Sequence, residues 1–153
     1  MIMKYIRLFE SEKSLLNYIN NIDKKNIKKL ISSGADLNVQ NRVGLTALIV
    51  AVVFNHIRII KLLINAGADL NIQDYNGDTA LIHAADLTST YPIHGIVVIK
   101  LLIDAGIDWN KKNNQGKDFL DYLNDKDEKL IIKLYPNQYK KYLMIKGAEK
   151  YNL

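Results

Sequence analysis

The sequence predicts an all-α protein in which short helix-turn-helix units stack side by side into a solenoid. Its 153 residues are the length of a single domain. Three series of residues recur at the same intervals of 33 and 39 residues: Gly34, Gly67, Gly106; Gly44, Gly77, Gly116; and Leu48, Leu81, Leu120. Self-similarity of this period is typical of a stacked array of supersecondary units. The longer second interval indicates an insertion of six residues within the 33-residue period.

The first segment, residues 1–33, is interpreted as an N-terminal capping unit. The stretch LLNYINNIDKKNIKKLISSG contains two helical patterns hinged at residues 21–23, and no turn of the repeating type precedes them. The second pattern is rich in lysine on one face. One wet face is expected of a unit that ends a stack.

One full period, residues 34–73, predicts two helices and an exposed turn. The stretch IRIIKLLI, residues 57–64, is apolar nearly all round, so the helix is expected to be buried between neighbours. Gly67 then supplies the left-handed residue that closes a helix. The stretch DYNG, residues 74–77, has Asp first and Gly fourth, as in a type I turn. NRVG and NNQG occupy the equivalent positions, and we call these three turns the fingers (residues 41–44, 74–77 and 113–116).

The second full unit, residues 74–112, repeats this pattern with the insertion near 86–95. Thr79 is expected to cap the helix ALIHAA through its hydroxyl group, and the paired alanines Ala84 and Ala85 favour a close neighbour. The inserted stretch DLTSTYPIHG is predicted to be an elongated loop, because loop closure costs little extra entropy as a loop grows. Trp109 takes the place of Leu37 and Leu70, so we expect it to pack at the base of a finger.

The C-terminal part is interpreted as a second capping unit, residues 113–136, followed by an extra helix and tail, residues 137–153. The capping unit begins like a repeat at Gly116, and Asp125, Asp127 and Glu128 suit the start of a helix. The extra helix, expected to cover the last open face, has apolar residues at Tyr139, Leu143 and Met144. The chain is thus predicted to form one domain of about four units, two full and two capping, plus a C-terminal helix.

The two full units resemble the ankyrin repeat family. GLTALIVAVVFNHIRIIKLLINAGADLN and GDTALIHAADLTSTYPIHGIVVIKLLIDAGIDWN follow the family pattern G-x-T-P-L-H-x-A-A…G-H…I-V-K-L-L-L…G-A-D-V-N. Ala47 and Ala80 stand where the family prefers Pro. Ile49 and Ile82 stand in its His position, with His83 displaced by one, so we expect apolar packing to replace the usual histidine hydrogen bonds.

Composition excludes several functional classes. The chain has no cysteine, so it has no disulfide, thiolate metal site or cysteine nucleophile. No apolar run approaches the roughly 20 residues of a membrane span, and the N-terminus lacks a signal-peptide pattern. The net charge is +5, yet only three of the 21 basic residues are arginine, the residue that reads bases. A solvated surface explains the lysines better than a nucleic-acid site, so nucleic acid and membrane are not the expected partners.

The sequence offers no catalytic or metal-binding constellation and implies no cofactor, so we predict that the protein is not an enzyme. His56 is expected to make a local hydrogen bond at the start of a helix, and His83 to pack against the core. His94 has no second ligand at metal-binding spacing. We find neither a phosphate-binding glycine loop nor a nucleophile elbow.

The resemblance implies binding through a concave face, which is formed by the fingers and the first, inner helix of each unit. The fingertip candidates are Arg42, Val43, Tyr75, Asn76, Asn114 and Gln115. The candidates at the ends of the inner helices are Val53, Phe54, Asp86 and Leu87. An exposed Val53–Phe54 pair beside Tyr75 would be an aromatic anchor, unless the insertion buries Phe54. Tyr91, in the insertion, is a further candidate.

The leading functional hypothesis is a protein–protein interaction module that presents a rigid surface to one protein partner, as an effector would. One alternative is an inhibitor or immunity protein for a toxin or enzyme. The other is a nucleic-acid-associated regulator that uses the basic ends of the chain. We expect a monomer that is cytoplasmic, or that is delivered into a host cytosol by a route without a recognisable signal peptide. The sequence does not identify the partner.

Overall fold

The computed structural model describes residues 24–147. This part contains seven α-helices and a 3-10 helix, and no strand. The elements are α2 (Lys24–Ser32), α3 (Ala47–Val53), α4 (Ile57–Asn65), α5 (Ala80–Thr90), α6 (Pro92–Asp104), η1 (Phe119–Tyr122), α7 (Asp125–Leu134) and α8 (Pro136–Ile145). The first helical pattern of the N-terminal capping unit lies outside the described residues.

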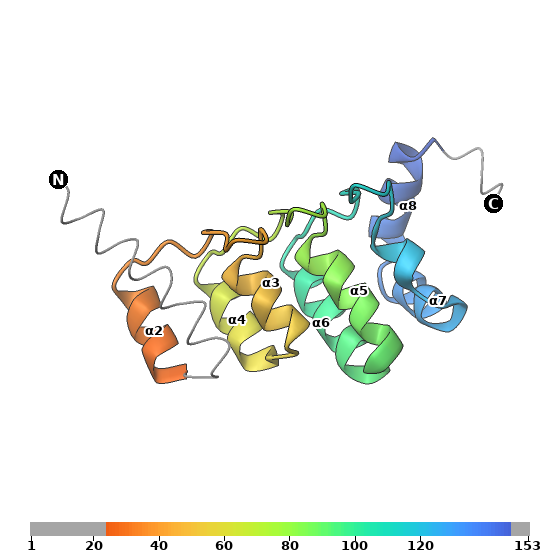
Figure 1. Ribbon diagram of the computed structural model, residues 1–153. Helices are drawn as coiled ribbons and strands as arrows, with labels where there is room; N and C mark the ends of the chain where they lie inside the picture. The colour runs from red at the N-terminus through yellow and green to blue at the C-terminus, as the bar shows by residue number, and fades with distance from the viewer. Residues whose placement is uncertain (1–23, 148–153) are drawn as a thin grey trace.

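The helices stand side by side in one row, and the fingers run along one edge of it (Figure 1). Helix α3 packs against α4 within its unit, and α5 against α6. Helix α5 also packs against α3 on one side and η1 on the other, so the inner helices join the units. The all-α solenoid predicted from the repeat is confirmed.

The core runs through the row because each inner helix is buried on nearly every side. Residues 47–52 of α3 are all at most 3 % exposed. Ala51, Ala84 and Ala85 are fully buried, and their small side chains allow the helices to approach closely. Ile49 and Ile82, in the family's histidine position, are 1 % and 2 % exposed. Apolar packing therefore does replace the histidine at these two positions, as expected.

The helix starts follow the capping rules. The hydroxyl groups of Thr46 and Thr79 accept hydrogen bonds from the backbone N–H groups of Ile49 and Ile82, at 3.3 Å in both units. Each threonine thereby satisfies one of the N–H groups that the first turn of a helix leaves unpaired. Asn124 caps α7 in the same way, and the acidic residues predicted for its first turn are there.

The insertion is not a loop, which corrects the prediction from sequence. Helix α5 has 11 residues where α3 has 7, and α6 has 13 where α4 has 9. The connection between the helices shortens from three residues to Tyr91 alone. The six residues therefore add about one turn to each helix of the pair. Pro92 is compatible with this because it occupies the first turn of α6, where a helix needs no N–H donor.

A close contact between Gly95 of α6 and Thr88 of α5 holds the two added turns together. A Cβ atom at Gly95 would lie 2.8 Å from the backbone nitrogen of Thr88 and 2.6 Å from its methyl carbon. Both residues are buried. Glycine is thus required by the separation of the two helix backbones, because Gly95 itself has ordinary helical geometry.

An aromatic cluster closes the C-terminal end of the row. The ring of Trp109 lies 5.2 Å from that of Phe119 and 6.1 Å from that of Tyr135, both edge to face. Trp109 is 7 % exposed, so its predicted packing role is confirmed. In α8, Tyr139 and Tyr142 are buried, whereas Met144 is 69 % exposed. The prediction that Met144 faces the core is wrong, because Tyr142 takes that side of the helix.

Candidate binding surface

The fingers are built from repeated side-chain turns. In the second finger, Asp74 Oδ1 accepts hydrogen bonds from the backbone N–H groups of Asn76, at 2.8 Å, and Asp78, at 3.0 Å. The backbone N–H of Gly77 closes the turn on the Asp74 carbonyl at 2.9 Å. Asn41 and Asn113 make the same contacts in the other two fingers. These turns confirm the prediction of a side-chain acceptor first and glycine last.

Hydrogen bonds between units connect the base of each finger to the base of the next. The Gln40 side-chain amide donates to the carbonyl oxygens of Gly44, at 2.6 Å, and Gln73, at 2.9 Å. One period later, Gln73 donates to the carbonyls of Gly77 and Lys112. Two asparagines add a second type of link: Asn38 Oδ1 and Asn71 Oδ1 accept from the backbone N–H groups of Asp69 and Asp108, each at 2.8 Å.

The third finger has further contacts to the second. The backbone N–H of Asn114 donates to the carbonyl of Asn76, and its side-chain amide donates to the carbonyl of Tyr75, both at 2.9 Å. The Asn113 amide reaches Asp78 Oδ1 and the Tyr122 hydroxyl, each at 2.8 Å. Asn114 is exposed, but these bonds also give it a structural role. These hydrogen bonds fix the backbone of each finger relative to the next.

Sequence reasoning missed the glutamine and asparagine links. Their signal was present, because Asn38 and Gln40 recur as Asn71 and Gln73 after one period. The recurrence shows only that the positions repeat. The groups that these side chains contact belong to the backbone of the next unit, so only the structure identifies them.

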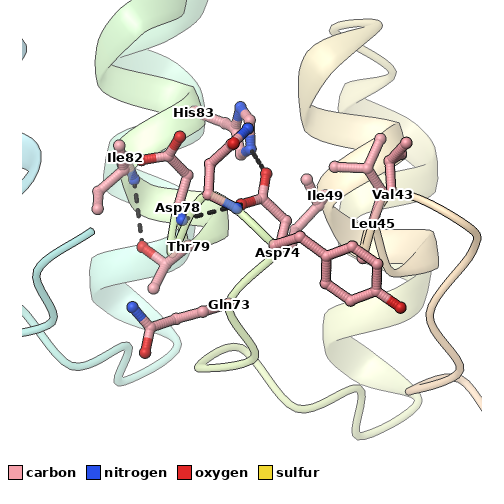
Figure 2. A network of polar contacts seen from close by, with 12 residues as sticks. Val43, Leu45, Ile49, Gln73, Asp74, Asp78, Thr79, Ile82 and His83 are labelled. Carbon is pink, nitrogen blue, oxygen red and sulfur yellow. Dashed lines mark hydrogen bonds and ion pairs between the residues drawn. The ribbon is translucent and has the colours of Figure 1, made fainter. Parts of the chain in front are cut away.

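A polar group behind the second finger was also missed. His83 Nε2 lies 2.9 Å from Asp74 Oδ2, and Asp74 is almost fully buried (Figure 2). Apolar packing has therefore not replaced every histidine contact, because the displaced His83 still reaches the finger. Ligand atoms of Asp74, Asp78 and His83 all lie within 4.8 Å of one another. Both Asp74 oxygens and one Asp78 oxygen already accept hydrogen bonds, so the group is explained as a polar network.

His56 does not make the local hydrogen bond that was predicted for it. His56 stands at the N-cap of α4, but its side chain makes no capping hydrogen bond. Its ring stacks on that of Phe54, with centroids 5.9 Å apart. Burial lowers the pKa of His56 below its ordinary value, because a low-dielectric surrounding disfavours the imidazolium form.

The fingertips carry exposed apolar side chains side by side. Val43 is 57 % exposed and Tyr75 is 66 % exposed. A Cβ atom at Gly44 would lie 2.6 Å from Cδ1 of the Tyr75 ring. The ring of the second finger thus rests on the glycine of the first, next to Val43. We call Val43 and Tyr75 the fingertip patch. Arg42, Asn76, Asn114 and Gln115 are also exposed.

The candidates on the inner helices lie away from the fingertip patch. Val53 and Phe54, at the end of α3, are 42 % and 55 % exposed, so the lengthened α5–α6 pair does not bury Phe54. They are not beside Tyr75, however, because α3 runs away from the fingers for seven residues, or roughly 10 Å at 1.5 Å per residue. Asp86 is exposed and Leu87 half-buried, within α5 and not at its end. Tyr91, 53 % exposed, lies at the α5–α6 connection.

Stacked helix pairs joined by hydrogen-bonded fingers define a repeat scaffold. A family model described as ankyrin repeats (3 copies) matches residues 15–113. The chain belongs to the ankyrin repeat family, whose members are protein–protein interaction modules. No helix in residues 24–147 is both long and apolar enough to cross a membrane.

Among solved structures, the chain is similar to the ankyrin repeat domain of Bcl-3, described as a unique member of the IkappaB protein family. The TM-score is 0.68 at 25 % sequence identity, over 78 % of this chain and 50 % of that one. The match thus spans about half of the Bcl-3 domain. The search of curated proteins gave no match.

Proposed function

We propose that this protein binds a protein partner through its concave face, with the fingertip patch of Val43 and Tyr75 as the centre of the contact. The observation that carries the proposal is the exposure of two large apolar side chains on adjacent fingers that are fixed by hydrogen bonds. Fixed aromatic side chains dominate interface energies because little conformational entropy is lost when they are covered.

The remaining candidates form the surroundings of this contact. Arg42, Asn76, Asn114 and Gln115 flank the fingertip patch along the finger edge, and offer hydrogen bonds of the kind found at an interface rim. Val53, Phe54, Asp86 and Leu87 supply a second contact area along the inner helices. A partner that covers both areas extends along α3 from the fingers to Phe54.

Affinity capture with the immobilised full-length chain tests this proposal. A partner captured by the wild type should be lost or strongly reduced with Tyr75→Ser and Val43→Ser. Ile93→Ser is the matched control, because Ile93 is an equally apolar surface residue, 80 % exposed, on α6. Thermal midpoints should stay close to wild type in all three variants. Equal capture by Tyr75→Ser and wild type would refute the fingertip patch as the contact.

A further inference from the structure

The polar network behind the second finger satisfies hydrogen bonds but leaves negative charge without a permanent cation. The Asp74 side chain is only 2 % exposed, and one carboxylate oxygen each of Asp74 and Asp78 lie within 4.8 Å of each other. Among residues 24–147, no lysine or arginine forms an ion pair with either carboxylate. Buried charges in proteins are normally paired or coordinate a metal ion.

Asp118 shows how the same chain compensates another fully buried carboxylate. It pairs with the ammonium group of Lys146 and also accepts from the Tyr142 hydroxyl. The ion-pair partner of Asp74 is the imidazole of His83, which is a cation only when it is protonated. The two carboxylates of Asp74 and Asp78 therefore share one conditional positive charge, so a cation bound between them would be stabilised.

Each of the two carboxylates has one oxygen that is held by a group outside the cluster. Asp74 Oδ1 accepts from backbone N–H groups of the finger, and Asp78 Oδ1 accepts from the Asn113 amide of the next finger. Asp74 Oδ2 faces His83 Nε2 at 2.9 Å. Asp78 Oδ2 accepts no hydrogen bond from residues 24–147. Hydrogen bonds of this kind orient the ligands of metal sites, and here they leave the second oxygen of each aspartate available.

The donor set suits Zn²⁺ better than Mg²⁺ or Ca²⁺. Asp74, Asp78 and His83 are directed toward one another (Figure 2), and each offers one ligand atom within 4.8 Å of the other two. An imidazole nitrogen with two carboxylate oxygens is a set that Zn²⁺ accepts, whereas Mg²⁺ and Ca²⁺ prefer oxygen alone. Because Zn²⁺ lies about 2.0–2.2 Å from such donors, the three side chains need only a small inward movement.

The cluster is open enough for an ion to enter. The His83 side chain is 22 % exposed and Asp78 is half-buried, so both can be reached from solvent. Asp74 is the buried member, and the turn of the finger fixes it in place. One fixed ligand and two that can adjust allow the site to close around an ion.

We propose that Asp74, Asp78 and His83 bind a Zn²⁺ ion, with one oxygen of each aspartate and Nε2 of His83 as ligands and water in the fourth position. The ion takes the place of the proton between His83 Nε2 and Asp74 Oδ2, and the imidazole then carries its proton on Nδ1. The site ties the second finger to α5, next to Tyr75 in the sequence. The proposal does not depend on the protein partner proposed above, and its tests use the chain alone.

Isothermal titration calorimetry with ZnCl₂, on the full-length chain freed of metal by a chelator, tests the site. The wild type should bind one ion per chain. Asp78→Asn and His83→Gln should each weaken binding by at least about tenfold, since even groups that only orient a metal ligand contribute about 10–100-fold. Asp78→Asn keeps an acceptor for Asn113, so the finger contact is retained. Asp74 is left unchanged because it forms the turn.

His94→Gln is the matched control, because His94 is an exposed histidine outside the cluster. It should bind Zn²⁺ as the wild type does. Wild-type affinity in both Asp78→Asn and His83→Gln, or a loss in His94→Gln alone, would overturn the proposal. Absence of binding at about 1 mM Zn²⁺ would also overturn it, because a site that weak contributes less than about 4 kcal/mol of binding free energy.

Thermal unfolding of the wild type gives a second test that does not require any variant to fold. Zn²⁺ at about 100 times its Kd should raise the thermal midpoint by about 5–10 °C, because the ion binds the folded state. The same concentration of Mg²⁺ should have little effect. An unchanged midpoint with Zn²⁺, or an equal rise with Mg²⁺, would refute a site in which the His83 imidazole is a ligand.

Discussion

The side-chain oxygen of Asn71 accepts a hydrogen bond from the backbone N–H of Asp108 at 2.8 Å, across 37 positions of the sequence. Asn38 makes the same link to Asp69. Each asparagine belongs to the loop after an outer helix and contacts the equivalent loop of the next unit. The stability of the row therefore depends on side chains that reach across a unit boundary, in addition to the apolar core.

Replacing Asn71 with alanine is expected to lower the free energy of unfolding by about 1–3 kcal/mol, because the partly buried N–H of Asp108 loses its acceptor. Asn71→Asp is the matched control, since its carboxylate retains an oxygen at the same position, and the loss should be smaller. Urea denaturation followed by circular dichroism measures both. Equal losses for the two variants would show that the hydrogen bond is not the cause.

The sequence was sufficient to predict the repeated architecture because its signals are local or strictly periodic. Finger turns need an acceptor first and glycine fourth, and helix starts need a hydroxyl group such as that of Thr79, so both can be predicted without the neighbouring unit. Trp109 could be placed in the core by comparison with Leu37 and Leu70. The turn and cap requirements are met within a few residues, and the position of Trp109 follows from the period alone.

The errors concern positions where a neighbouring segment decides the outcome. The sequence predicts that Tyr91 and Pro92 belong to an elongated loop, because residues added to a turn cost little loop-closure entropy, yet Pro92 begins α6. Met144 and Tyr142 are two positions apart on one helix, and only the contacts of α8 decide which is buried. The contact between His83 and Asp74 joins two segments nine residues apart, and no periodic pattern predicts it.

Gly95→Ala should destabilise the protein, although alanine favours helices over glycine by about 1 kcal/mol. The added methyl group would lie 2.8 Å from the backbone nitrogen of Thr88, and backbone atoms cannot move aside without separating α5 from α6. We expect a loss of about 1–3 kcal/mol in the free energy of unfolding. Thr90→Ala, an exposed change in the same turn region, should have little effect. A stabilised Gly95→Ala variant would mean that the two added helical turns do not pack as described.

Asp118 should be the main anchor of α8. Its side chain is fully buried, accepts from the backbone N–H of Leu120 and from the Tyr142 hydroxyl at 3.0 Å each, and pairs with Lys146. Asp118→Ala leaves the Tyr142 hydroxyl without this partner and removes the acceptor for the Leu120 N–H, so it is expected to cost about 1–3 kcal/mol. Asp118→Asn keeps an acceptor and should cost less.

Trp109, the one tryptophan in the chain, reports on this end of the row because its ring lies 6.5 Å from that of Tyr142. In Asp118→Ala, thermal unfolding followed by tryptophan fluorescence should begin at a lower temperature than unfolding followed by circular dichroism. Coincident transitions in this variant would show that α8 and the central units unfold together, and would contradict a local role for Asp118.

The lowered pKa of His56 predicts that the protein loses stability at acid pH. In the unfolded chain the imidazole titrates near its ordinary value of about 6.5, whereas burial beside Phe54 lowers the pKa in the folded protein. The unfolded state therefore binds the proton more readily, so stability is retained above about pH 6.5 and falls as the pH drops through the folded pKa. His56→Gln should show a smaller decrease in thermal midpoint between pH 7.5 and pH 5 than the wild type. His94→Gln, at an exposed position, controls for the removal of an imidazole, and a wild-type slope in His56→Gln would contradict the assignment.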